Sequence, residues 1–288
     1  MKLIRFGEKG IEKPGVLIDD QRWDCSAHFE DWNRSFFQNN GLLKLQELIS
    51  KAAAFPLIEA EQRWGPPIAR PGMIMCVGLN YSDHAAEAGM QMPLEPILFM
   101  KATNTLSGPY DDVPIPRGSS KTDWEVELGI VLNRDLLYLD HESEAWDAIA
   151  GFCVVHDVSE RAFQIERGGQ WVKGKSAPGF SPVGPYLVTK DEIDDVHNLQ
   201  MQLYRNGNLM QNGNTKTMIF QSAFLVHYIS QFMTLEAGDL ITTGTPPGVG
   251  LGMKPPQYIE DGDIIELSIE QLGTQKQIFR AFQSNTNV

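Results

Sequence analysis

The feature that most constrains the fold is a series of short apolar runs, typical of buried strands, with few helical patterns between them. The strand candidates after residue 72 are 73–78, 97–100, 124–132, 152–155, 186–188, 201–204, 239–242 and 264–269. Helical patterns in the same part of the chain cover only 81–88, 143–150, 159–165 and 217–232. Because the helices do not alternate regularly with the strands, the pattern disfavours a parallel βαβ sheet. It predicts an α+β protein that is mainly β.

The first 70 residues have the pattern of a smaller unit. Two short strand candidates, 3–6 and 15–18, precede a proline- and glycine-rich segment at 65–72. Such a segment is typical of a linker, and 288 residues are enough for one large domain with a small appendage. We therefore expect a small N-terminal domain over 1–70 and a catalytic domain over 71–288.

Charge and composition narrow the choice of partners. The formal net charge of −13 disfavours nucleic acid and anionic membrane surfaces, which bind through basic patches. The N-terminus has scattered charges instead of an apolar core, and no apolar run approaches the roughly 20 residues of a bilayer span. The cysteines Cys25, Cys76 and Cys153 lie too far apart to suggest a disulfide framework. We expect a cytoplasmic protein that acts on a small anionic substrate.

Two glutamates form the strongest candidate for a metal site. In the run Asp-Trp-Glu-Val-Glu-Leu, Glu125 and Glu127 are separated by the apolar Val126. On a strand, positions i and i+2 share a face, so the two carboxylates converge while Val126 and Leu128 enter a core. Like charges held this close favour a divalent cation with oxygen ligands, such as Mg²⁺, Mn²⁺ or Ca²⁺. The alternative is the solvated face of an amphipathic strand.

Asp157 is the candidate for a third carboxylate. It follows a buried strand candidate at 151–155, and a strand end is well placed to reach into a cleft. The alternative is a helix cap, since Asp157 and Ser159 both precede the helical stretch near Glu160. Sequence spacing leaves both readings open.

His84 and Glu87 form a candidate general-base pair. Positions i and i+3 share a helix face, and a carboxylate that orients an imidazole is a common way to activate water. The alternative is an exposed polar helix.

Two loops are rich in glycine. Residues 169–176 match the phosphate-loop pattern and end in Lys175-Ser176, but prolines follow where that motif requires a helix. We therefore expect no nucleotide there and consider Lys175 as an ammonium beside a metal. Residues 242–252 contain threonines and many turn formers, and their hydroxyl and N–H groups are expected to bind a substrate carboxylate.

Four segments in combination resemble the fumarylacetoacetate hydrolase family. They are 77–84, 123–129, 156–164 and 243–250. The resemblance implies a mixed β-roll, commonly a homodimer or a dimer-based oligomer, preceded by a small N-terminal domain. Its implied metal ligands are Glu125, Glu127 and Asp157, for Mg²⁺ or Mn²⁺. Its implied catalytic residues are His84, Glu87 and Lys175, and its substrate-binding residues are Gln164, Thr245 and Arg161.

The same resemblance implies a hydrolase that cleaves a C–C bond of a 2,4-dioxo acid to pyruvate and a second carboxylic acid. Within the family the chain is most similar to bacterial hydrolases of 2,4-diketo-3-deoxy-L-fuconate or rhamnonate. The alternatives are a ureidoglycolate lyase, or an oxaloacetate decarboxylase or tautomerase, with the same metal site. A metal-binding interaction protein is the non-enzymatic alternative.

Overall fold

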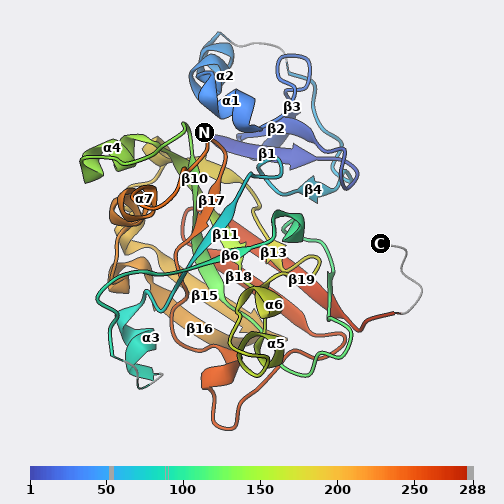
Figure 1. The fold of residues 1–288 in the computed structure, drawn as a ribbon. Coiled ribbons are helices and arrows are strands. Elements are labelled where there is room, and N and C mark those ends of the chain that lie inside the picture. The colour runs from blue at the N-terminus through green and yellow to red at the C-terminus, as the bar shows by residue number, and fades with distance from the viewer. Residues whose placement is uncertain (52–54, 88, 90, 284–288) are drawn as a thin grey trace.

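The computed structural model describes residues 1–51, 55–87, 89 and 91–283, and most of its regular structure lies in two large β-sheets (Figure 1). The larger sheet is mixed, because β17 and β5 run parallel while the other neighbours are antiparallel. Across it the order is β3 (Gln21–Asp24), β2 (Lys13–Ile18), β1 (Lys2–Phe6), β14 (Leu187–Thr189), β11 (Ile149–His156), β10 (Val126–Leu132), β17 (Leu240–Thr242), β5 (Ile74–Gly78) and β6 (Ile97–Lys101), with β4 (Trp64–Gly65) also paired to β1.

The smaller sheet packs against the larger one. Its order is β16 (Asn208–Asn214), β15 (Gln200–Arg205), β18 (Ile264–Ile269), β19 (Gly273–Arg280) and β8 (Val113–Pro114). Two short pairs complete the strands: β12 (Ser159–Glu160) with β9 (Thr122–Asp123), and β13 (Ser181–Pro182) with β7 (Leu106–Ser107). The predicted mainly β class with few helices is confirmed.

The helices are short and lie at the ends and edges of the sheets. They are α1 (Arg34–Gln38), α2 (Gly41–Ser50), α3 (Ser82–Glu87), α4 (Glu142–Asp147), α5 (Arg161–Ile165), α6 (Val172–Lys175) and α7 (Ser222–Ser230), with the 3-10 turns η1 (Thr103–Thr105), η2 (Lys190–Glu192), η3 (Val196–Asn198), η4 (Thr215–Thr217) and η5 (Gly250–Gly252). The helix expected over 159–165 begins two residues later, because its first two residues pair with β9. The last residue of the helix expected over 81–88 lies outside the described residues.

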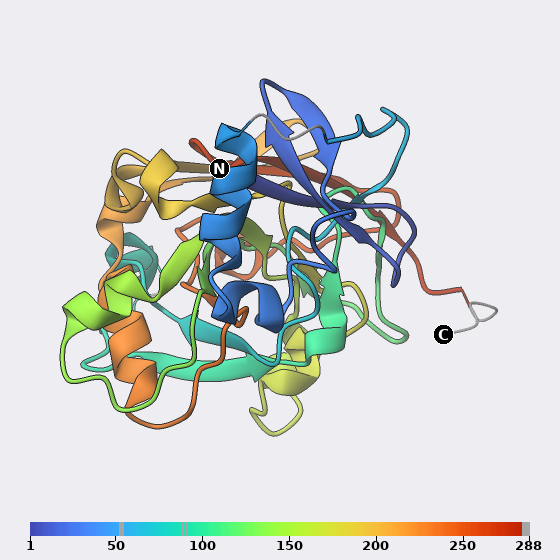
Figure 2. The same ribbon diagram turned by 90° about the horizontal axis from the view of Figure 1, so that it is seen from above.

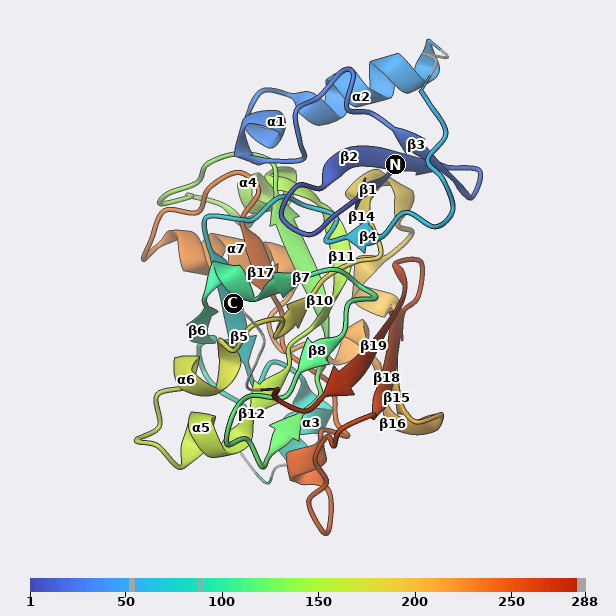
Figure 3. The same ribbon diagram turned by 90° about the vertical axis from the view of Figure 1, so that its right-hand side faces the viewer.

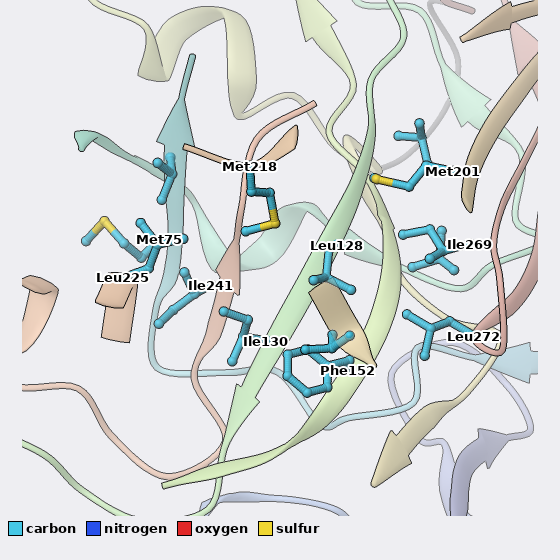
Figure 4. Packing of buried hydrophobic residues seen from close by; sticks show 14 of the residues in the cluster. Met75, Leu128, Ile130, Phe152, Met201, Met218, Leu225, Ile241, Ile269 and Leu272 are labelled. Atoms are coloured by element: carbon cyan, nitrogen blue, oxygen red, sulfur yellow. The ribbon is translucent and has the colours of Figure 1, made fainter. Parts of the chain in front are cut away.

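The main core lies between the two sheets (Figure 4). Leu128 and Ile130 of β10 and Phe152 of β11 pack with Met201 and Ile269 of the smaller sheet, and none of these five side chains is more than 1% exposed. Each such side chain contributes roughly 1.5–3 kcal/mol when fully buried. Because strand side chains alternate, the intervening residues of β10 and β11 face the opposite side of the sheet.

A second core on that opposite side joins the N-terminal residues to the rest of the chain. Trp32 is fully buried there with Val131 and Cys153, and its indole N–H donates to the carbonyls of Ile4 at 2.8 Å and Gly15 at 3.1 Å. Helices α1 and α2 cover this end of the molecule (Figures 2 and 3). Since β1 pairs with β14, the N-terminal strands extend the large sheet, and the domain boundary at residue 70 stays a prediction.

The opposite end of the large sheet carries α3, α5 and α6 (Figures 1 and 3). The large sheet therefore has a core on each face, the N-terminal helices at one end and these three short helices at the other. None of the helices in the described part of the chain is long and apolar enough to cross a lipid bilayer.

Candidate metal centre and active site

Neighbouring strands bring three carboxylates together. Glu125 immediately precedes β10, and Glu127 is its second residue. Val126 pairs with His156 at the end of β11, so Asp157, the next residue, lies beside Glu125 and donates its N–H to the Glu125 carbonyl at 3.0 Å. Side-chain oxygens of Glu125, Glu127 and Asp157 lie within 4.8 Å of one another, and all three residues are buried. Period-2 alternation and a strand end thus produce one acidic cluster.

Two buried cations hold part of this cluster. The Lys175 ammonium donates to Glu125 at 2.7 Å and to Asp157 at 2.5 Å, and the Arg161 guanidinium donates to Glu125 at 2.5 Å. Burial alone would raise the pKa of Glu125, but Arg161 and Lys175 outweigh it and hold that pKa well below its ordinary value. Burial alone would lower the pKa of Lys175, and the carboxylates of Asp157 and Glu125 reverse this effect and raise it. Both groups are therefore charged.

Glu127 is the carboxylate without a cation. Among the described residues it has no ion-pair partner, and it accepts a hydrogen bond from the Gly244 N–H at 2.9 Å. Burial, together with the charges of Asp157 and Glu125, raises its pKa well above the ordinary value. A buried carboxylate without an ion-pair partner is stabilised when it takes up a proton or binds a cation. Three oxygen donors around one point suit a hard divalent ion, so the residues present fit a metal of this kind.

The helix-cap reading of Asp157 does not hold. Glu160 caps α5, because its carboxylate accepts from the Ala162 N–H at 3.2 Å. The Asp157 carboxylate instead accepts from Lys101 and Lys175, both of which are buried. Asp157 therefore belongs to the acidic cluster.

The predicted general-base pair lies on α3, at the edge of a cavity that Glu125 and Glu127 also line. The His84 ring nitrogen Nδ1 is 3.2 Å from the Glu87 carboxylate, with the two side chains 16% and 30% exposed. Glu87 is also held by the Gly248 N–H at 3.2 Å. With Nδ1 facing Glu87, the Nε2 atom of His84 is the one available to a water molecule. His84 is partly buried and Glu87 is exposed, and both line the cavity.

The glycine-rich loop uses four of its N–H groups within the protein. They bind carboxylates of the protein itself, so these four are not free for a substrate carboxylate, and the role of Thr245 stays a prediction. The bonds are Gly244 to Glu127 (2.9 Å), Gly248 to Glu87 (3.2 Å), and Gly250 and Leu251 to Asp123 (2.6 and 3.0 Å). At Gly248 φ is 101°, and a Cβ would lie 2.0 Å from the Met210 carbonyl oxygen, so only glycine fits. The loop therefore holds three carboxylates in place: Glu127 of the acidic cluster, Glu87 of α3 and the buried Asp123.

The three residues expected to bind substrate line the same cavity as Glu125 and Glu127. Arg161 donates from Nε to Asp123 at 2.8 Å and from Nη1 to the Gln164 side-chain oxygen at 3.1 Å. The amide nitrogen of Gln164 donates to no described residue. The Thr245 hydroxyl donates to a carbonyl of β10 at 2.9 Å and accepts from Gln211 at 2.8 Å, so it has one lone pair left.

A cavity of about 470 Å³ unites these groups. Eight of the nine predicted site residues line it: His84, Glu87, Glu125, Glu127, Arg161, Gln164, Lys175 and Thr245. Asp157 lies behind them and is fully buried. Asp123 and Lys101 were missed from the sequence; Asp123 stands in the glutamate motif itself, whereas no local spacing marks Lys101.

The phosphate-loop match has the wrong local structure for that motif. Helix α6 ends at Lys175, with Ser176 as its C-cap, and α5 precedes the segment where a strand is required. The Lys175-Ser176 pair therefore lies at a helix C-terminus, where no N–H groups converge on an anion. The prediction of no nucleotide here thus has a geometric reason, and calorimetry with ATP would test it.

Known proteins are similar to this chain in sequence and in fold over nearly its whole length. A protein of Burkholderia multivorans, provisionally assigned as a hydrolase, is 51% identical over 283 residues, which cover 98% of this chain and 99% of that one. The fumarylacetoacetate hydrolase of Exiguobacterium antarcticum has a TM-score of 0.82 and 32% identity, with 98% of this chain and 100% of that chain covered.

Two further solved structures carry more specific names. Maleylpyruvate hydrolase of Sphingobium sp. SYK-6, solved with manganese(II) and pyruvate, has a TM-score of 0.80 and 26% identity over 98% of this chain and 100% of that one. A 5-carboxymethyl-2-hydroxymuconate delta-isomerase of Mycobacterium smegmatis has a TM-score of 0.78 and 26% identity, with 99% of this chain and 100% of that chain covered. Residues 73–280 match the family described as fumarylacetoacetate (FAA) hydrolase C-terminal. The chain belongs to the fumarylacetoacetate hydrolase family.

Proposed function

We propose that this protein is a divalent-metal-dependent hydrolase of acylpyruvate-type 2,4-dioxo acids, which it cleaves to pyruvate and a second carboxylic acid. The observation that carries the proposal is one cavity lined by a buried acidic cluster and by a histidine–glutamate pair. The family consists of hydrolases and isomerases, and the maleylpyruvate hydrolase neighbour was solved with manganese(II) and pyruvate.

Glu125, Glu127 and Asp157 would hold the cation, and Mg²⁺ or Mn²⁺ fits their oxygen donors. The bound ion would supply electrostatic stabilisation to the carboxylate and 2-oxo oxygens of the substrate. On the protein side, Lys175 adds a fixed positive charge beside the same oxygens, which favours the negative charge that develops on the pyruvate unit. The amide nitrogen of Gln164 and the guanidinium of Arg161 are placed to orient the substrate.

The general-base pair supplies the hydrolytic step. His84 Nε2 takes a proton from water while Glu87 holds Nδ1–H and stabilises the imidazolium. The hydroxide oxygen bonds to C4, the C3–C4 bond breaks, and its electron pair leaves with the three-carbon fragment. That fragment gains a proton at C3 to become pyruvate, and the C4 carbon leaves as a carboxylic acid.

Four alternatives share parts of this site. An isomerase, lyase or decarboxylase would use the acidic cluster and Lys175 but would need no hydrolytic water. The presence of His84 and Glu87 at the cavity wall therefore favours the hydrolase. A metal-binding interaction protein would release no pyruvate from any dioxo acid.

The decisive experiment is a panel of acylpyruvates and 2,4-diketo-3-deoxy sugar acids, incubated with the protein and Mg²⁺ or Mn²⁺, with pyruvate as the readout. We expect release that EDTA abolishes and added metal restores. Absence of pyruvate from every substrate with either metal would refute the proposal. The sugar-acid substrate stays a prediction, as does the homodimer, which light scattering in solution would test.

A further inference from the structure

The lining of the cavity combines polar side chains with several apolar ones. Glu125, Glu127, Lys175 and Arg161 form what we call the polar end, where the pyruvate unit of a dioxo acid would lie. The apolar walls are formed by Ile97, Phe99, Ile165, Trp171, Val249 and Leu251. The volume of about 470 Å³ lies within the usual range of pockets that enclose drug-sized ligands. The space beyond the pyruvate unit is therefore available to an acyl substituent.

The apolar wall is continuous from the polar end outwards. The Lys175 ammonium lies 5.1 Å from the centroid of the Phe99 ring, and the rings of Phe99 and Trp171 meet edge to face at 5.1 Å. Trp171 packs on Gly78, where a Cβ would approach its ring to 2.9 Å, and Gly78 pairs with Ile97 across β5 and β6. A substituent that leaves the polar end thus contacts aromatic and aliphatic groups.

No described cation that lines the cavity is free for a second anionic group. Lys175 and Arg161 are paired with Glu125, Asp157 and Asp123, as described above. Two further basic side chains, Arg167 after α5 and Lys173 in α6, do not line the cavity. Arg167 lies over the Phe163 ring, and Lys173 donates to the Arg167 carbonyl. Glu87 at the cavity wall adds negative charge. A terminal carboxylate against the apolar wall would be desolvated without a cation to pair with, and hydroxyl groups there would lose their hydrogen bonds to water.

We propose that the acyl substituent accepted by this site is neutral and apolar, an aliphatic chain or an aromatic ring, and is neither charged nor polyhydroxylated. This inference rests on the proposed function and extends it to the substrate class. It favours simple acylpyruvates over the sugar acid expected from the sequence, and it distinguishes this site from one for a dicarboxylate such as maleylpyruvate.

The test uses 2-oxo acids without a 4-oxo group, which bind but offer no cleavable bond. With the Mg²⁺-saturated protein, calorimetry compares 2-oxohexanoate, 2-oxoadipate and 5,6-dihydroxy-2-oxohexanoate, which share a six-carbon chain. We expect 2-oxohexanoate to bind at least about tenfold more tightly than either of the others, since a misplaced polar group in an apolar pocket is strongly selected against. Equal or tighter binding of 2-oxoadipate or of the dihydroxy acid would overturn the inference.

Two variants locate the effect. Trp171→Ala should weaken 2-oxohexanoate binding about tenfold and leave pyruvate binding within about twofold, because pyruvate does not reach the wall. Met100→Ala is the matched control, since Met100 is the neighbour of Phe99 on β6, does not line the cavity and is 53% exposed. Loss of pyruvate binding in Trp171→Ala to the same extent as 2-oxohexanoate binding would show that the wall does not select the substituent.

Failure of this inference and failure of the proposed function have different signatures. If the protein cleaves acylpyruvates but binds 2-oxoadipate best, the function stands and the substituent preference is wrong. If 2-oxohexanoate is preferred but no acylpyruvate releases pyruvate, the apolar pocket stands and the hydrolase proposal is wrong.

Discussion

Replacing His84 by alanine tests the proposed mechanism most directly. The substitution removes the only imidazole among the described residues that line the cavity, while Glu125, Glu127 and Asp157 keep their contacts. General-base catalysis typically contributes about 10²- to 10⁴-fold, which corresponds to about 3–5.5 kcal/mol of transition-state stabilisation. We therefore expect kcat for acylpyruvate cleavage to fall by about that factor, with metal affinity unchanged.

Glu87→Gln separates the charge of the carboxylate from its shape. The glutamine oxygen can still accept from the Gly248 N–H, but it lacks the negative charge that lies 3.2 Å from His84. The Coulomb energy of an ion pair near a protein surface is about 5 kcal/mol at such a distance, and partial exposure lowers this value. We expect a loss in kcat of about ten- to a hundredfold, smaller than that of His84→Ala.

The assay measures pyruvate release from the best acylpyruvate at saturating Mg²⁺, with decarboxylation of oxaloacetate measured in parallel. Decarboxylation needs no activated water, so it should change less in both variants. His227→Ala is the control, because His227 lies on α7 and does not line the cavity. If His84→Ala retains hydrolysis within a few-fold of the unmodified protein, the pair is structural and the mechanism is wrong.

Three further predictions concern the buried charges. Because the pKa of Glu127 is raised, divalent-ion affinity should increase with pH in the window that opens above 4.5, and calorimetry should record the release of about one proton per ion bound. The metal-free native state holds this extra proton, so the free energy of unfolding should fall as pH rises through the same window. Binding without proton release would contradict this. Lys175→Met should lower kcat by roughly 10²-fold or more while Mn²⁺ affinity stays equal or rises, because the ammonium no longer occupies two of the ligand carboxylates; a large loss of affinity would refute it. Asp123→Asn should lower the free energy of unfolding by about 3–5 kcal/mol in urea titrations, because it breaks one of the two buried ion pairs of Arg161. The half-exposed control Asp112→Asn should change it by less than about 1 kcal/mol, and equal effects would refute the role of Asp123.

Much of the acidic cluster could be predicted from the sequence because the patterns that indicate it are local. Alternation along β10 predicts that Glu125 and Glu127 share a side, and the end of the apolar run predicts where Asp157 lies. The mainly β class followed in the same way from short apolar runs with few helical patterns. These inferences need no knowledge of distant contacts.

Other features could not be predicted because they depend on contacts between distant segments. The cation at Lys101 reaches Asp157 across 56 positions, and no spacing in the sequence reports this. From its composition, the loop around Gly244 was expected to bind a substrate carboxylate. The sequence does not show which side chains lie next to the loop in the folded chain. In the folded chain those neighbours are Glu127, Glu87 and Asp123. Whether the first 70 residues form a separate domain is equally unspecified by composition.

The incomplete pairing of the acidic cluster has a consequence for the order of assembly. Four buried carboxylates, those of the cluster and Asp123, face three buried cations, those of Lys101, Lys175 and Arg161, so this buried group is neutral when Glu127 carries its proton. Exchange of that proton for a divalent ion leaves one net positive charge in a protein whose total charge is −13. A monoanionic dioxo acid is then attracted to a site that would otherwise offer it no net charge. Metal loading should therefore precede substrate binding, and the two should show positive thermodynamic coupling.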